Sequence, residues 1–157
     1  MQKKLVLLTA GLIMSTLLGG CGKDSELTQF KKDIDTFCTD ISTLDTAMNN
    51  VDATAVTAKA ELLGYLDDLD EKFKEFAALD FPEEFDYLEA LADESSEYMT
   101  EAVTYYHKTY DEAATFNEAN ANYAQENYSR ALKRVQIIIT FLHGEEPADM
   151  DIEIQYE

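Results

Sequence analysis

An apolar stripe with three- and four-residue spacing constrains the fold of this chain more than any other feature. In the first such segment the spacing is unbroken, at Leu27, Phe30, Ile34, Phe37, Ile41, Leu44, Met48 and Val51. This spacing places apolar side chains on one side of an α-helix, which must then bury them against other helices. The pattern therefore predicts an all-α protein built as a helical bundle.

The next stripe predicts a second helix. Its apolar residues are Leu62, Leu66, Leu69, Phe73 and Phe76. Asp52 or Thr54 can accept a hydrogen bond from its first turn and so cap it. We expect the helix to end before Pro82, because the residue preceding a proline is pushed out of the α region. Asp80 and Glu83 then resemble a capping box for a third helix that has Pro82 in its first turn.

Residues 82–143 can be interpreted as one long helix or as two, since no glycine or further proline occurs before Gly144. We expect two, with a break near residues 113–117, where Thr115 and Glu118 can form another capping box. Four segments of roughly 25–30 residues then form an antiparallel up-down bundle. The last helix should end at Gly144 with a glycine cap.

The first 24 residues have the organisation of a bacterial export signal. Lys3 and Lys4 precede roughly 14 mostly apolar residues, which is too few for a transmembrane helix of about 20. The run ends in Leu18-Gly19-Gly20-Cys21, and this sequence resembles the lipobox of bacterial lipoproteins. The resemblance implies that residues 1–20 are removed and that Cys21 is lipidated and becomes the new N-terminus. The alternative is an ordinary secretory signal with a chance cysteine.

The resemblance, which covers residues 1–24, and the apolar patterns that follow it together predict an organisation in four parts. These are a signal peptide over residues 1–20, a lipidated N-terminus and tether over 21–24, a helical bundle over 25–144 and an acidic tail over 145–157. The tether spans at most about 13 Å when extended, which keeps the bundle close to the lipid. The expected location is a membrane of the cell envelope, with the lipid-anchored chain facing outside the cytoplasm.

The charge of the chain restricts its partners. A formal net charge of −20 argues against nucleic-acid binding, which needs a basic face. It also argues against a bundle that lies flat on an anionic leaflet. With Cys21 bound to lipid, Cys38 has no disulfide partner in the chain, so we expect a buried free thiol, with an intermolecular disulfide as the alternative.

Motifs for catalysis or cofactor binding do not occur in the sequence. A carboxylate-bridged metal site in a four-helix bundle needs Glu-x-x-His pairs, but Thr104 and Thr140 stand three residues before His107 and His143. His107 and Asp111, four residues apart, supply at most half a metal site. Haem-attachment and serine-nucleophile motifs are also missing. We therefore expect no metal, no cofactor and no catalytic residue.

Two features suggest an interaction surface. Tyrosines, which join a flat apolar ring to a polar tip, gather late in the chain at Tyr105, Tyr106, Tyr110, Tyr123 and Tyr128. Adjacent Tyr105 and Tyr106 cannot both face the core, so at least one should reach the surface. The tail, which is either strand-like or disordered, has alternating apolar residues that could pair with a partner's sheet edge, namely Met150, Ile152, Ile154 and Tyr156.

The sequence thus favours a non-catalytic lipoprotein that binds another protein, a second copy of itself or a component of the envelope. One alternative is a small-ligand or cation-binding lipoprotein with a pocket between the third and fourth helices, near the tyrosines. Another is an enzyme of unrecognised type, whose site is assembled from distant residues.

Overall fold

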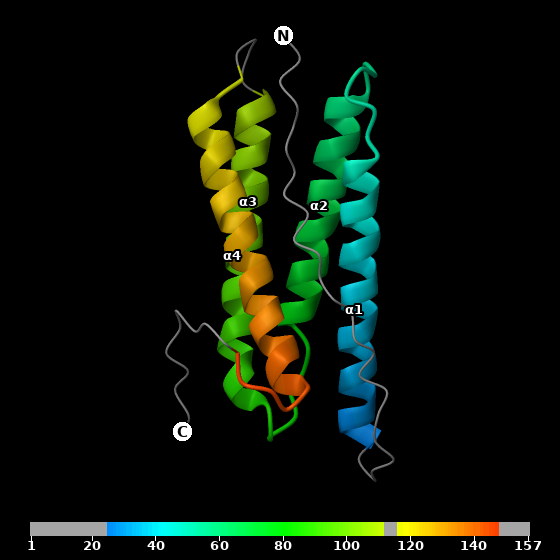
Figure 1. The fold of residues 1–157 in the computed structure, drawn as a ribbon, viewed down its shortest axis with the longest axis vertical. Coiled ribbons are helices and arrows are strands. Elements are labelled where there is room, and N and C mark those ends of the chain that lie inside the picture. The colour runs from blue at the N-terminus through cyan, green and yellow to red at the C-terminus, as the bar shows by residue number, and fades with distance from the viewer. Residues whose placement is uncertain (1–24, 112–115, 148–157) are drawn as a thin grey trace.

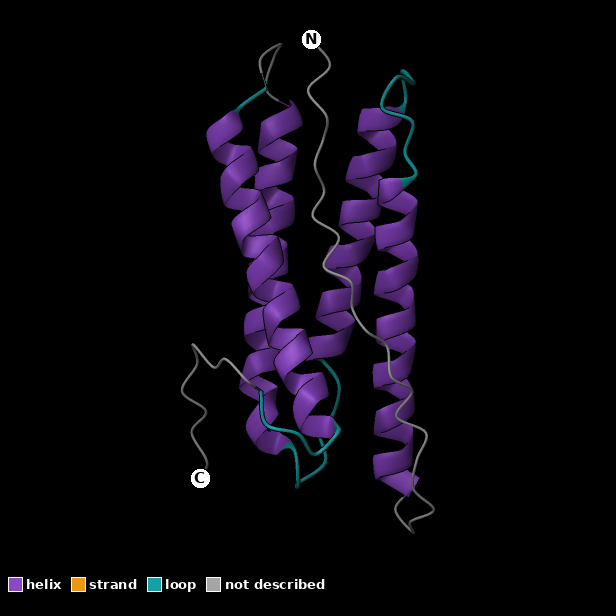
Figure 2. Cartoon of the chain, in the orientation of Figure 1, coloured by secondary structure: helices purple, strands orange, loops and turns teal. Residues whose placement is uncertain are grey.

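The computed structural model describes residues 25–111 and 116–147, and this part of the chain consists of helices and turns without strands (Figures 1 and 2). The long helices are α1 (Ser25–Asn49), α2 (Ala58–Ala77), α3 (Glu89–Asp111) and α4 (Glu118–Leu142), and a short 3₁₀ helix, η1 (Asp86–Leu88), precedes α3. Consecutive long helices run in opposite directions (Figure 1). The expected antiparallel four-helix bundle is confirmed. The expected signal peptide, Cys21 and the apolar tail residues from Met150 to Tyr156 lie outside the described residues.

The predicted apolar stripe of α1 faces the core. Phe30, Ile34, Phe37, Ile41 and Met48 are buried, and Leu27 and Leu44 pack against them. The five apolar residues predicted for α2 are all buried as well. Phenylalanine rings join the two helices, because Phe37 stacks on Phe76 with 4.3 Å between ring centroids and meets the edge of Phe73 at 5.3 Å.

Small residues are buried on both α3 and α4. Ala92, Ser95 and Ala102 on α3 are fully buried, and so are Ala124 and Ala131 on α4. Small side chains allow two helix backbones to approach closely, and α3 and α4 are the most extensively packed pair in the bundle. α3 also packs on α2, and α2 packs on α1.

The predicted start of α2 is wrong. Asp52 accepts hydrogen bonds from the backbone N–H and the hydroxyl of Thr54, at 2.9 and 2.7 Å, which close a turn ahead of the helix. The residue at the cap position is Thr57, whose hydroxyl donates to the Glu61 carboxylate at 2.6 Å. A local side-chain-to-backbone bond at Asp52 has therefore replaced the expected helix cap.

The predicted capping box at Asp80 and Glu83 is also wrong. The chain near Pro82 forms a turn, in which the Phe85 N–H donates to the Pro82 carbonyl at 2.7 Å, and α3 begins only after η1. Phe81 explains the delay, because its buried ring packs on Phe30 with 4.8 Å between centroids. Burial of Phe81 holds the chain as it leaves α2, and η1 precedes the start of α3.

The expected break between the third and fourth helices is confirmed, with α3 ending at Asp111 and α4 starting at Glu118. The cap of α4 is Asn117, whose side-chain oxygen accepts from the Asn120 N–H at 3.1 Å, and Thr115, the expected cap, lies outside the described residues. At its other end α4 stops at Gly144, which has φ +75°. The N–H groups of Gly144 and Glu145 donate back to α4 carbonyls at 2.8 and 3.1 Å, as in a Schellman motif.

Candidate interaction surface

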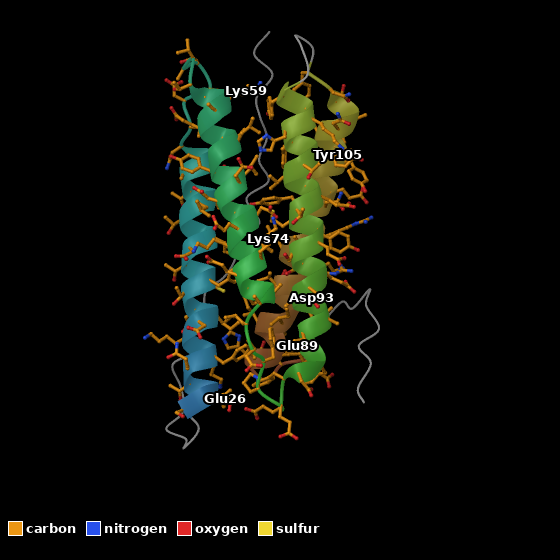
Figure 3. All side chains as sticks on the ribbon, turned by 180° about the vertical axis from the view of Figure 1, so that it is seen from behind. Glu26, Lys59, Lys74, Glu89, Asp93 and Tyr105 are labelled. Atoms are coloured by element: carbon orange, nitrogen blue, oxygen red, sulfur yellow. The ribbon has the colours of Figure 1, made fainter. Side chains whose placement is uncertain are left out.

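The most distinctive surface lies along α3 and α4 and is centred on two tyrosines. Tyr105 of α3 and Tyr123 of α4 pack with 4.4 Å between ring centroids. Tyr123 is 41% exposed, and its hydroxyl donates to the Glu101 carboxylate at 3.0 Å. The Lys108 ammonium lies 4.2 Å from the centre of the Tyr105 ring. Figure 3 places Tyr105 in the half of the bundle away from Glu26, at the start of α1.

A third tyrosine continues this surface. Tyr98 stands seven residues before Tyr105, two turns along the same side of α3. The guanidinium groups of Arg130 and Arg134 lie over its ring, 5.6 and 5.1 Å from the centroid. These are the two arginines of the whole sequence. We call Tyr98, Tyr105 and Tyr123, with the charged side chains that contact them and the ion-pair partners of those side chains, the tyrosine face.

The charges described on the tyrosine face balance. Lys108, Arg130 and Arg134 are the cations. Their counterparts are Glu101, which bonds to Tyr123, Glu94, which pairs with Arg134 at 2.9 Å, and Glu126, which pairs with Arg130. This balance contrasts with the net charge of −20 of the chain.

The other predicted tyrosines lie elsewhere. Tyr128 is buried in the core, and Tyr106 packs against the core from α3. Burial raises the pKa of Tyr106 to about 12 and also raises that of Tyr128, with the nearby carboxylate of Asp45 adding to the second effect. Tyr110 packs on Phe116 with 6.1 Å between centroids. The adjacent Tyr105 and Tyr106 therefore divide between surface and core, as the sequence requires.

His107 contacts a carboxylate of another helix, and the side chain of Asp111, the other residue of the half-site, lies outside the described residues. The Nε2 atom of His107 lies 2.7 Å from Oδ1 of Asp67 on α2, so the imidazole links α2 to α3. Within the described ranges, no three histidine, cysteine or acidic side chains are grouped so that they could hold a metal ion.

Cys38 is a buried free thiol, as expected, with 6% of its surface exposed. Burial raises its pKa to about 12, and the nearby Asp35 carboxylate acts in the same direction. The thiol is therefore protonated at neutral pH, which makes it a poor nucleophile.

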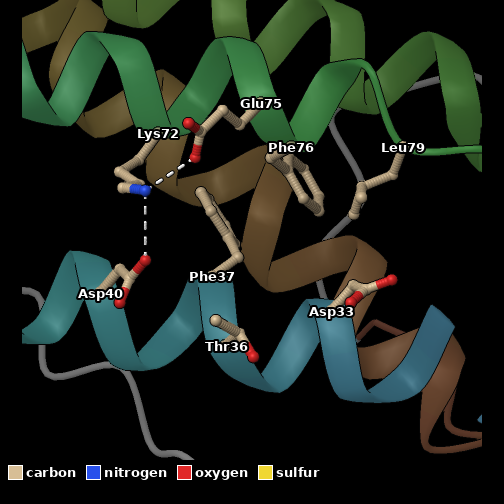
Figure 4. Close-up of a pocket in the computed structure, with 8 residues that line it drawn as sticks. All are labelled: Asp33, Thr36, Phe37, Asp40, Lys72, Glu75, Phe76 and Leu79. Atoms are coloured by element: carbon tan, nitrogen blue, oxygen red, sulfur yellow. Dashed lines mark hydrogen bonds and ion pairs between the residues drawn. The ribbon is translucent and has the colours of Figure 1, made fainter. Parts of the chain in front are cut away.

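A cleft between α1 and α2 was not predicted from the sequence (Figure 4). It has a volume of about 190 Å³ and is lined by Asp33, Thr36, Phe37, Asp40, Lys72, Glu75, Phe76 and Leu79. The Lys72 ammonium lies 2.7 Å from Glu75 and 3.4 Å from Asp40 of the other helix, and hydrogen bonding to Glu75, with a smaller contribution from Asp40, raises its pKa. Asp33 and Asp40 are seven residues apart and lie beside the apolar stripe of α1. Charged side chains at such positions usually meet the neighbouring helix, so their spacing could have indicated the charged walls of this cleft.

The described residues thus define an acidic antiparallel helical bundle with one charge-balanced aromatic face. Among them, no helix has an apolar stretch long enough to cross a membrane. Comparison with protein families, with curated proteins and with solved structures finds no match for this chain.

Proposed function

We propose that this chain is a lipoprotein anchored through Cys21 to a membrane of the cell envelope, outside the cytoplasm. Its bundle binds another protein, without catalysis, through the tyrosine face. The lipobox-like sequence Leu18-Gly19-Gly20-Cys21 supports the lipid anchor. One observation supports the binding role. Tyr105 and Tyr123 pack with 4.4 Å between ring centroids, remain partly exposed to solvent, and are bordered by Lys108 and Glu101.

The composition of the tyrosine face supports a protein partner. Tyrosine and arginine are enriched among the residues that contribute most to binding energy in protein interfaces. Tyr105 packs on Tyr123, and Arg130 and Arg134 lie over Tyr98, so several of these side chains are held in place before binding, which reduces the entropy cost of association. Elsewhere the excess of acidic residues repels acidic partners, whereas the balanced charge here does not.

Site-specific photo-crosslinking in native host cells tests the location of the interface. Tyr123 is replaced by a benzophenone amino acid in one variant, and the exposed Glu71 of α2 is replaced in a control. We expect a discrete protein adduct from position 123 and none from position 71. The same adduct from both positions, or none from position 123, would contradict the proposal.

Alanine substitution then measures the contribution of the rings. The double variant Tyr105→Ala with Tyr123→Ala should weaken binding of the crosslinked partner at least about tenfold, as is common for central interface tyrosines. The matched control is Asp68→Ala with Glu71→Ala, on the exposed side of α2. Equal affinity of both double variants, each with an unchanged helical circular dichroism spectrum, would remove the tyrosine face from the binding role.

The apolar tail is a separate candidate for the contact. Met150, Ile152, Ile154 and Tyr156 would bind as a strand added to the partner's sheet. A chain of residues 22–145 should therefore be compared with one of residues 22–157 for the same partner. If the chain of residues 22–145 no longer binds the partner, the contact lies in the tail. If it still binds, the tyrosine face is favoured.

Lipid attachment is tested independently of binding. Metabolic labelling with a fatty-acid analogue should mark the wild-type chain and leave Cys21→Ser unlabelled. Labelling of Cys21→Ser at the wild-type level would contradict the anchor, because Cys38 is buried and protonated.

A further inference from the structure

The cleft between α1 and α2 combines an apolar floor with charged walls. Phe37 and Phe76 stack at its base with an angle of 11° between their rings, and Leu79 extends the apolar surface (Figure 4). Lys72 and Asp40 lie toward one end of this floor, and Asp33 and Leu79 lie toward the other. A ligand in the cleft therefore meets apolar rings below and carboxylates at both ends.

The charge of the lining selects the sign of the ligand. Asp33, Asp40 and Glu75 supply three carboxylates against the single ammonium of Lys72. At one end, Lys72 lies between Asp40 and Glu75. At the other end, Asp33 accepts a hydrogen bond from the neutral amide of Gln29 at 2.7 Å, which leaves its negative charge uncompensated by that contact. The lining thus has an excess of negative charge and attracts a cation.

The size of the cleft limits the ligand. Its volume of about 190 Å³ is smaller than the roughly 300–1,000 Å³ of common small-molecule pockets, so it suits a group of the size of one side chain. The apolar floor favours a hydrocarbon stem over a bare, strongly hydrated ion. We infer that this cleft binds a primary alkylammonium group, with the stem on Phe37, Phe76 and Leu79 and the ammonium at the carboxylates. The site is separate from the tyrosine face and does not depend on the function proposed for that face.

Lys72 already shows which interaction the cleft favours. Its own ammonium bridges carboxylates from both helices. Lys72 therefore competes with an external ammonium for Asp40 and Glu75. Removal of this internal cation should strengthen binding of an alkylammonium ligand, whereas a cleft that bound anions through Lys72 would lose affinity.

Titration followed by amide NMR tests the site in the chain of residues 22–157, which contains all described residues. The probes are 1,5-diaminopentane and Nα-acetyl-lysine amide, and 1-pentanol is the uncharged control. We expect both amines to shift the amides around Phe37 and Phe76, with pentanol much weaker. Tighter binding of the diamine indicates a free small ligand, and tighter binding of the lysine derivative indicates a side chain from another protein.

Substitutions separate a specific site from general attraction to an acidic surface. Lys72→Met should tighten diamine binding about threefold to fivefold, and Asp40→Asn should weaken it by a similar factor, the range expected for one exposed ion pair. The matched control is Lys74→Met, which makes the same charge change two residues along α2, where Lys74 pairs with Asp70 at 2.7 Å outside the cleft. Equal effects of Lys72→Met and Lys74→Met, or amide shifts spread over the whole acidic surface, would overturn the inference.

Discussion

Phe73 is among the largest side chains that the described bundle buries completely, with 0% of its surface exposed. Phe73→Ala should lower the free energy of unfolding by about 3–5 kcal/mol, because it removes buried apolar area and leaves a cavity. Val56, which is fully exposed, is the control, and Val56→Ala should change stability by less than about 0.5 kcal/mol. Urea unfolding followed by circular dichroism measures both. A loss below about 1 kcal/mol for Phe73→Ala would contradict the packing of α2 described above.

Cys38 should be nearly inert in the folded protein. Burial raises the pKa of its thiol from 9.0 to about 12, so its thiolate fraction at neutral pH falls on the order of a thousandfold. A chromogenic thiol reagent added to residues 22–157, in which Cys38 is the remaining cysteine, should react slowly before unfolding and rapidly in urea. Equal rates in both conditions would show that the thiol is not buried.

At the scale of the helices, Gly64 and Gly144 form a matched pair with opposite expectations. Gly64 lies inside α2 with open space around an added methyl group, so Gly64→Ala should stabilise the protein by about 0.5–1 kcal/mol. Gly144 has φ +75°, and Gly144→Ala should cost roughly 1–2 kcal/mol despite equally open space. Thermal unfolding of the two variants tests this contrast, and a shift of the same sign in both would contradict it.

The helices also differ in how firmly they are attached. α1 and α4 have the same length of 25 residues, but α4 packs closely on α3, whereas the extensive contact described for α1 is with α2 alone. Amides in the middle of α1 should therefore open with a lower free energy than amides in the middle of α4. Native-state hydrogen exchange in residues 22–157 measures this difference. Equal protection of both helices would indicate that the bundle unfolds as one cooperative unit.

The sequence predicted the helices better than their ends. Helix positions follow from apolar periodicity, which is a local pattern, and the stripe from Phe30 to Met48 is buried as expected. The caps depend on competition between neighbouring groups and on tertiary contacts. Asp52 bonds to Thr54 ahead of the helix, and Phe81 is held by Phe30, and neither outcome is visible in the spacing of residues.

The candidate sites were predicted less well for a related reason. Because Tyr105 and Tyr106 are adjacent in the sequence, their side chains were expected to point to different sides of the helix. That Tyr105 meets Tyr123, while Tyr128 faces the core, depends on the rotation of α4 against α3. The cleft between α1 and α2 depends on the register of the two helices, so periodicity within each helix did not reveal it.

At the scale of the whole molecule, the buried thiol and phenol groups should make the protein less stable at alkaline pH. The pKa values of Cys38 and Tyr106 rise from 9.0 and 10.0 to about 12, and that of Tyr128 also rises. Above pH 9 the unfolded chain therefore loses protons that the folded chain retains, so the stability present below pH 9 falls between pH 9 and pH 12. Urea midpoints measured across this range should decline, and Tyr106→Phe should make the decline less steep. A constant midpoint would contradict the burial of these groups.

The position where α1 begins sets a geometric limit on any partner. The start of α1 at Ser25 lies at the end of the bundle opposite the end of α3 and the start of α4 (Figure 1). Tyr105 stands 16 residues along α3 from its start, a rise of about 24 Å. If Cys21 is anchored in the membrane as proposed, a tether of at most about 13 Å when extended keeps the tyrosine pair within roughly 40 Å of the bilayer surface. The proposed anchor therefore requires a partner whose contact site lies inside this thin layer, and a protein confined to a more distant part of the envelope would not meet it.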